Sequence, residues 1–161
     1  KHAGARLRLV GDGLERGGIV HTWARQNGVD NNVEFVGRAD RLELAGEYAR
    51  AAVFCSPSLE ESFGNTLVEA LQAGLPVIAG KKSGAVPWVL FEGQAGRLVD
   101  VRDPSAIASA ICEAIENPSS TVAPGFDVVA ALAERYAPSV VAARYATEYR
   151  RVIAIETERR R

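Results

Sequence analysis

Two glutamates, Glu61 and Glu69, frame the part of the sequence that is best suited to chemistry. Phe63 and Gly64 stand between them, and a helix is predicted to begin directly afterwards, over residues 65–73. The first turn of a helix leaves backbone N–H groups unpaired and carries partial positive charge, and a glycine there lets a ligand approach the backbone. The segment therefore predicts a site for an anion such as phosphate.

The position of Glu69, about one turn into this helix, adds a second property to the site. Its carboxylate would repel a phosphate in contact with it, but it can accept hydrogen bonds from neighbouring hydroxyl groups. An anion site beside such an acid suits a nucleoside diphosphate. A plainer interpretation makes Glu61 a solvated loop acid and Glu69 a surface acid favoured near a helix N-terminus. The spacing alone leaves both interpretations open.

The pattern of the chain predicts the elements that position this segment. Short apolar runs alternate with segments of helical period, which predicts an α/β fold with an open, doubly wound parallel sheet and a helical C-terminus. In such sheets ligands bind at the carboxyl ends of the strands, where residues 57–64 lie. The predicted strands are residues 7–10, 33–36, 51–56, 76–79 and 96–99. The predicted helices are an amphipathic stretch ending near residue 27 and residues 41–50, 65–73, 84–91, 104–116, 126–135 and 139–156.

The composition of the 161 residues is that of an ordinary globular domain, with 47% apolar and 24% charged residues. Nineteen basic and 20 acidic residues leave a net charge of −1, so no global field attracts nucleic acid or an anionic membrane. Two cysteines and two histidines assemble no plausible zinc site, and no apolar run approaches the roughly 20 residues that span a bilayer. We expect a cytoplasmic protein that binds neither metal nor nucleic acid.

Residues 54–79 closely resemble the donor-binding signature of retaining GT-B glycosyltransferases of family four. The hallmark of that signature is a glutamate, seven residues and a second glutamate, followed by Ala and later by Gly-x-Pro-Val. Glu61 and Glu69 keep this spacing, and residues 74–77 read Gly-Leu-Pro-Val. The resemblance extends over roughly residues 6–117 and includes four further landmarks in the family's order, at residues 9–13, 33–38, 48–53 and 93–99.

The resemblance implies the Rossmann-like, donor-binding half of a GT-B fold and a role for individual residues. The family transfers a sugar from a nucleoside diphosphate sugar to an acceptor hydroxyl with retention of configuration, and it requires no metal. By this resemblance Glu61 is the catalytic residue and faces the hydroxyls of the donor sugar. The resemblance implies that the backbone around Phe63 and Gly64 contacts the sugar, and that the backbone of Asn65, Thr66 and Leu67 contacts the diphosphate. It further implies that Glu69 holds the ribose hydroxyls and that the backbone near Val36, Gly37 and Arg38 contacts the base.

Two departures from the family's pattern qualify this expectation. The first strand of this chain resembles the family's second, so the preceding strand, with its cationic clamp for the diphosphate, and the N-terminal acceptor domain are missing. We therefore expect residues 1–161 to form a single nucleotide-sugar-binding domain, truncated at its N-terminus, that does not transfer sugar on its own. The acceptor domain is then an implied partner, and the full-length protein is compatible with peripheral association with a membrane. The second departure is Trp88, which stands where the family commonly has an acid and which we interpret as a packing residue.

Other functions remain open on the sequence. Another GT-B enzyme, such as a nucleotide-sugar epimerase or a polysaccharide synthase, would share the fold. Such an enzyme would be expected to have an acid/base histidine near the sheet edge, and neither His2 nor His21 is convincingly placed for that. A non-catalytic nucleotide-binding or interaction domain is a further alternative, against which the retention of both Glu61 and Glu69 argues mildly.

Overall fold

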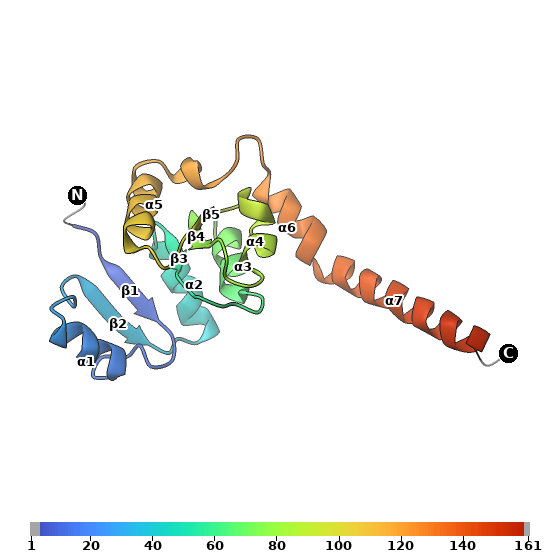
Figure 1. The fold of residues 1–161 in the computed structure, drawn as a ribbon, viewed down its shortest axis with the longest axis horizontal. Coiled ribbons are helices and arrows are strands. Elements are labelled where there is room, and N and C mark those ends of the chain that lie inside the picture. The colour runs from blue at the N-terminus through green and yellow to red at the C-terminus, as the bar shows by residue number, and fades with distance from the viewer. Residues whose placement is uncertain (1–3, 160–161) are drawn as a thin grey trace.

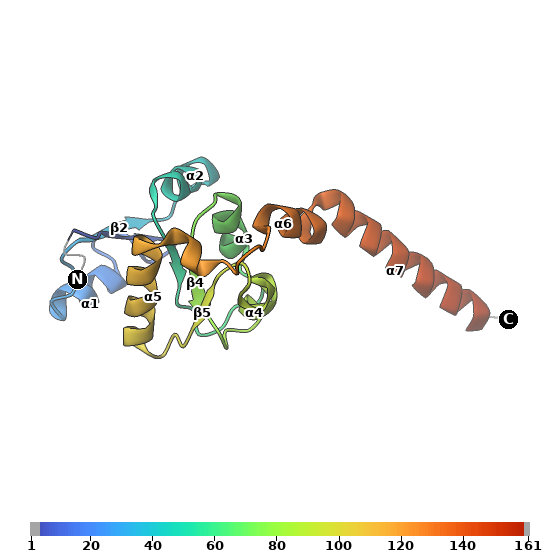
Figure 2. The ribbon, with the colours of Figure 1, turned by 90° about the horizontal axis from the view of Figure 1, so that it is seen from above.

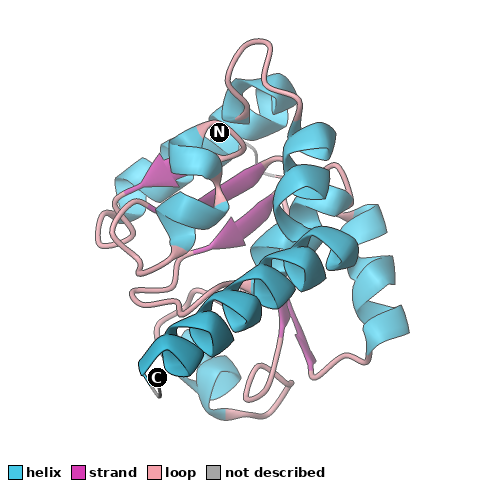
Figure 3. Ribbon diagram, turned by 90° about the vertical axis from the view of Figure 1, so that its right-hand side faces the viewer, coloured by secondary structure: helices cyan, strands magenta, loops and turns pink. Residues whose placement is uncertain are grey.

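The computed structural model describes residues 4–159, which form an α/β fold of parallel strands with a helical C-terminal part (Figure 1). The predicted fold class is confirmed. The described strands hydrogen-bond as two groups, which are visible in Figure 3. In one group β1 (Leu7–Val10) pairs in parallel with β2 (Val33–Gly37). In the other, β4 (Val77–Gly80) lies between β3 (Phe54–Ser56) and β5 (Arg97–Val99), again in parallel.

Strand β4 is the centre of the larger sheet, and all four of its residues are buried. Val77 and Ala79 pack into a cluster with residues of helices α3 (Asn65–Gln72) and α4 (Val86–Val89). Ile78, which points to the opposite face, packs with Ala110 and Ala114 of α5 (Pro104–Glu116). Successive strand residues therefore carry helices on both faces, the arrangement that a doubly wound sheet requires.

The remaining helical elements connect the strands and complete the C-terminal part. They are α1 (Ile19–Gln26), α2 (Arg41–Arg50), the short 3₁₀ turns η1 (Phe91–Gly93) and η2 (Pro118–Thr121), α6 (Val128–Tyr136) and α7 (Pro138–Arg159). Local caps define several starts: Asp40 and Glu43 form a capping box on α2, and Asp103 accepts two backbone N–H bonds at the start of α5.

Several predicted boundaries differ from the structure by one to three residues, and two of the differences have clear local reasons. The strand predicted over residues 51–56 begins only at Phe54, because the N–H of Ala51 donates to carbonyls of the preceding turn and ends α2. The helix predicted over residues 84–91 is broken, because Phe91 and Glu92 adopt positive φ angles of 53° and 55°. Both angles lie in the left-handed region, which a right-handed helix does not accommodate.

Helix α7 runs away from the rest of the molecule in both Figure 1 and Figure 2. None of its 22 residues is buried. It follows α6 directly, and the Arg144 guanidinium on α7 reaches back to donate to the carbonyl of Glu134 at 3.4 Å. The domain core is thus built without α7.

Candidate functional site

The loop of residues 57–64, after β3, is held by the loop that follows β4. The buried hydroxyl of Ser83 donates to the carbonyl of Ser58 at 2.5 Å, and the N–H of Ala85 donates to the carbonyl of Glu61 at 3.0 Å. Gly84 between them has φ +55°, and a side chain there would overlap the Glu61 carbonyl. Two neighbouring loops at the carboxyl ends of β3 and β4 therefore fix each other. The local sequence pattern around Ser83 does not predict this contact.

Gly64 starts α3 in the left-handed conformation, with φ 84° and ψ 60°. A Cβ at this position would lie 2.7 Å from Cδ1 of Leu67, so the turn requires glycine for both its dihedral angles and its packing. No side chain caps the helix, and its first turn contains no acidic residue. The exposed Asn65 and Thr66 thus begin a helix whose positive end is not neutralised by its own side chains.

Leu67 differs from its two neighbours in the predicted diphosphate contact. Its side chain is completely buried in the core, and its N–H already donates to the carbonyl of Gly64 at 2.9 Å. Within the first turn, the amides of Asn65 and Thr66 are therefore the groups best placed to meet an anion.

Glu69 has a partner that the sequence analysis missed. The hydroxyl of Tyr48, on α2, donates to Oε2 of Glu69 at 3.0 Å, and it lies 3.5 Å from the carbonyl oxygen of Thr66. Burial, together with the hydrogen bond and charge of Glu69, raises the pKa of Tyr48 far above its usual range, so the hydroxyl remains a donor. Tyr48 lies in a helix with an apolar face. A buried tyrosine hydroxyl usually has a polar partner, but which acid supplies it depends on tertiary packing.

Glu61 is half-buried, and its main chain is fixed by the bond from Ala85. Among residues 4–159 the structure gives its carboxylate no hydrogen bond or ion pair, so the acid is available to an external ligand.

Phe63 and Trp88 form one aromatic cluster with Tyr136 of α6. The ring of Phe63 meets Tyr136 edge-on at 5.8 Å and lies 6.2 Å from Trp88. Arg135 lies 4.8 Å above the Trp88 ring and donates to the Trp88 carbonyl at 2.6 Å. Trp88 is 48% exposed and yet has these neighbours, which fits the predicted packing role.

The three residues predicted for the base lie at the end of β2, in the smaller sheet. The N–H of Gly37 donates to Leu14 at 3.1 Å and its carbonyl accepts from Gly11 at 2.8 Å, so its polar groups hold the loop after β1. Val36 is exposed, and Arg38 makes a long ion pair of 3.7 Å with Asp12. Within the described chain, no hydrogen bond or ring contact joins residues 36–38 to residues 57–69.

Further features bear on the remaining expectations. Nδ1 of His21 accepts from the N–H of Gly17 at 2.9 Å and its ring meets Phe35 edge-on, whereas His2 lies outside the described residues. Residues 4–159 contain no group of three His, Cys, Asp or Glu side chains that could hold a metal ion. In the same part of the chain, no helix is both long and apolar enough to cross a membrane.

Comparison with known proteins identifies the family. Residues 1–117 match the model of the family described as glycosyl transferases group 1, and the chain therefore belongs to that family. It is 34% identical over 131 residues to a D-inositol 3-phosphate glycosyltransferase of Corynebacterium kroppenstedtii, covering 78% of this chain and 29% of that protein. It is also 34% identical over 151 residues to a phosphatidyl-myo-inositol mannosyltransferase of Mycobacterium leprae, covering 91% and 38%.

Solved structures show the same fold. A sucrose-phosphate synthase of Thermosynechococcus elongatus superposes with a TM-score of 0.75 at 27% identity, over 93% of this chain and 39% of that one. HepE of Anabaena, solved in complex with UDP and glucose, superposes with a TM-score of 0.72 at 25% identity, over 89% and 40%. The chain spans about a third of the length of the curated relatives it matches.

Proposed function

We propose that this chain is the donor-binding part of a glycosyltransferase. The enzyme transfers a sugar from a nucleoside diphosphate sugar to an acceptor hydroxyl, with retention of configuration. The observation that carries the proposal is the start of α3: a glycine turn without a capping side chain, with a positioned carboxylate one turn further on. Family membership and the likeness to a protein solved with UDP and glucose support it.

In this proposal each part of the site meets one part of the donor. The amides of Asn65 and Thr66 bind the diphosphate, and the positive end of α3 stabilises the negative charge that builds up as the diphosphate departs. Glu69 accepts hydrogen bonds from the ribose hydroxyls, and Glu61 faces the hydroxyls of the donor sugar. The backbone of residues 36–38 contacts the base. The transfer needs no metal, because positively charged protein groups and the N-terminus of α3 stabilise the departing diphosphate.

The proposal extends to the whole protein, whose relatives are about three times as long as this chain. Acceptor binding belongs to the part outside these residues, so the 161-residue chain binds donor but does not transfer sugar at a useful rate. The protein acts in the cytoplasm, without nucleic acid, and its full-length form associates peripherally with a membrane where its acceptor is a lipid.

Titration of the ¹⁵N-labelled chain with UDP, GDP and ADP, followed by amide NMR shifts, tests the proposal. We expect saturable shifts at Asn65 and Thr66 for at least one nucleotide. The variant Glu69→Ala weakens that binding about tenfold, since a charge-assisted hydrogen bond is lost. Glu148→Ala on α7, an exposed helix acid outside the core, is the matched control and changes nothing. Unchanged affinity in Glu69→Ala, or no binding of any nucleotide, contradicts the proposal.

A further inference from the structure

Glu69 occupies an exposed position on α3, where a glutamate side chain usually samples several rotamers. Ordering it on a ligand would cost conformational entropy. In this structure the Oε2 atom is already held by the hydroxyl of Tyr48 at 3.0 Å, across the interface between α2 and α3. The carboxylate thus has a fixed orientation before any ligand arrives.

Tyr48 is itself firmly placed. Its side chain is 8% exposed, and its ring meets that of Phe54 edge-on at 5.9 Å. It belongs to the same buried cluster as Leu67 and Leu71 of α3, so the two helices share one core. The adjacent Glu47 ties α2 to β1 through Arg8. The Tyr48 hydroxyl is therefore a rigid donor, because α2 is held against α3 by the shared core and against β1 by the Arg8–Glu47 pair.

The chemistry of the pair leaves room for a ligand. An ionised carboxylate offers about four acceptor positions on its two oxygens, whereas a phenol donates one hydrogen bond. Tyr48 takes one position on Oε2, so the other positions of the exposed carboxylate stay open to two vicinal hydroxyl groups. The raised pKa of Tyr48 keeps its proton in place near neutral pH, so the hydroxyl stays able to donate to Glu69.

We propose that Tyr48 is the positioning residue of the nucleotide site, holding the Glu69 carboxylate in the orientation that accepts the ribose 2′- and 3′-hydroxyls. This inference rests on the proposed function, because it assumes that Glu69 meets a ribose. It differs from a purely structural role in one respect. A residue that only supports the core affects every nucleotide equally, whereas a residue that acts through Glu69 affects only nucleotides that carry the ribose hydroxyls.

The test compares Tyr48→Phe with the wild-type chain, using UDP, GDP, ADP and their 2′,3′-dideoxy counterparts. Phenylalanine keeps the ring contact with Phe54 and removes only the hydroxyl. We expect about fivefold weaker binding of the ribonucleotide and unchanged binding of its dideoxy counterpart, since one neutral donor is lost. Tyr136→Phe is the matched control: it removes another part-buried hydroxyl, which lies 3.5 Å from a carbonyl, and leaves both affinities unchanged.

Combining Tyr48→Phe with Glu69→Ala tests independently whether Tyr48 acts through Glu69. If Tyr48 acts through Glu69, then Tyr48→Phe adds nothing in a Glu69→Ala background, and the double variant binds the ribonucleotide as weakly as Glu69→Ala. Equal losses for ribonucleotide and dideoxynucleotide, additive losses in the double variant, or no loss in Tyr48→Phe would each overturn the inference alone. Absence of binding by the wild-type chain overturns the proposed function, and the inference with it.

Discussion

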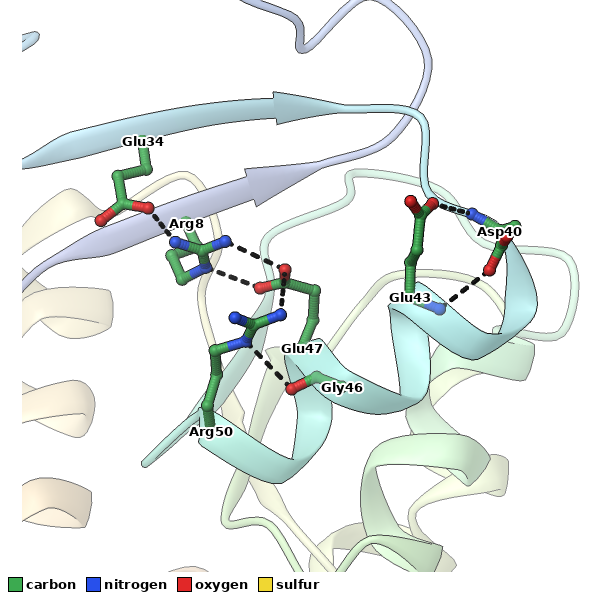
Figure 4. A network of polar contacts seen from close by, with 7 residues as sticks. All are labelled: Arg8, Glu34, Asp40, Glu43, Gly46, Glu47 and Arg50. Atoms are coloured by element: carbon green, nitrogen blue, oxygen red, sulfur yellow. Dashed lines mark hydrogen bonds and ion pairs between the residues drawn. The ribbon is translucent and has the colours of Figure 1, made fainter.

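Arg8 on β1 and Glu47 on α2 are joined by two hydrogen bonds, from Nε at 2.6 Å and from a terminal nitrogen at 2.9 Å (Figure 4). The Glu47 side chain is only 11% exposed, and its carboxylate also accepts from Arg50, while Arg8 pairs with Glu34 as well. The pair links the two-stranded sheet to the helix that carries Tyr48. The smaller sheet and the candidate site are thereby connected through one carboxylate.

We predict that Glu47→Gln lowers the melting temperature by about 2–4 °C at neutral pH, the shift that about 1 kcal/mol produces in a chain of this size. The glutamine keeps the volume of the side chain but removes the charge that the fork-like guanidinium pairs with. Differential scanning calorimetry measures the shift. Glu148→Gln on α7, which removes an exposed ion pair with Arg151, serves as the control and shifts the melting temperature by less than a degree.

The same pair predicts a pH dependence. The hydrogen bond from Arg8, opposed by partial burial and aided by the nearby positive charges, lowers the pKa of Glu47. A lowered pKa in the folded state means that the contribution to stability is complete above the ordinary glutamate pKa of about 4.3 and is lost as the pH falls further. The difference between wild type and Glu47→Gln therefore shrinks below about pH 4. A difference that grows on acidification would contradict the assignment.

The two glycines that flank α3 provide a matched pair for the turn at the candidate site. Gly64 and Gly74 have similar φ angles of 84° and 76°, so alanine is strained at both. Only at Gly64 does the new Cβ also meet a neighbour, Leu67, because nothing lies within 4 Å of it at Gly74. Urea denaturation is expected to show a loss of unfolding free energy larger by about 1–2 kcal/mol for Gly64→Ala than for Gly74→Ala. Equal losses of unfolding free energy in the two variants would contradict this prediction, because they would mean that Leu67 moves away from the new Cβ at position 64 without destabilising the fold.

The elements that the sequence predicts best are those whose ends are specified locally. Asp103 and Pro104 start α5, and the Asn117-Pro118 pair ends it, so the predicted and observed bounds agree. The glycine turn before α3 is also a local feature, which is why the anion-binding segment is recognisable without coordinates. The alanines at residues 51–52, in contrast, suit a helix end and a buried strand equally well, and the backbone bonds of Ala51 decide between them.

Contacts between residues distant in the sequence could not be predicted. Tyr48 and Glu69 are 21 positions apart and Ser83 and Ser58 are 25 apart, and each pair forms only when helices or loops pack together. The division of the described strands into two groups could not be predicted either, because the composition of a strand does not determine which strand it pairs with. Nothing in the local pattern around Glu69 therefore reveals that its carboxylate is held in place.

Arg135 on α6 connects that helix to the short α4. Its guanidinium lies 3.8 Å from the centre of the Phe91 ring and also covers Trp88, whose carbonyl accepts its hydrogen bond. We predict that Arg135→Gln destabilises the fold by about 1–2 kcal/mol in urea denaturation, since both a charge–ring contact and a hydrogen bond to a carbonyl are lost. Arg135→Lys retains part of the charge–ring contact but not the fork-shaped donor, so its loss is intermediate. A lysine variant less stable than the glutamine variant would contradict this order.

Removal of residues 138–161 tests whether α7 belongs to the folding unit. No residue of this helix is buried, and Tyr145, Tyr149, Val152 and Ile153 are all more than half exposed. We therefore predict that a chain ending at Ala137 melts within about 2 °C of the full chain, as expected when little apolar surface leaves the core. Far-ultraviolet circular dichroism should lose the signal of α7 alone.

Leu132→Ala on the neighbouring helix α6 provides the contrast, because this leucine is 6% exposed and its loss leaves a cavity that costs about 2–5 kcal/mol. If the chain ending at Ala137 lost as much stability as Leu132→Ala, α7 would stabilise the domain despite its exposure. That result would contradict the prediction that the core is complete without α7.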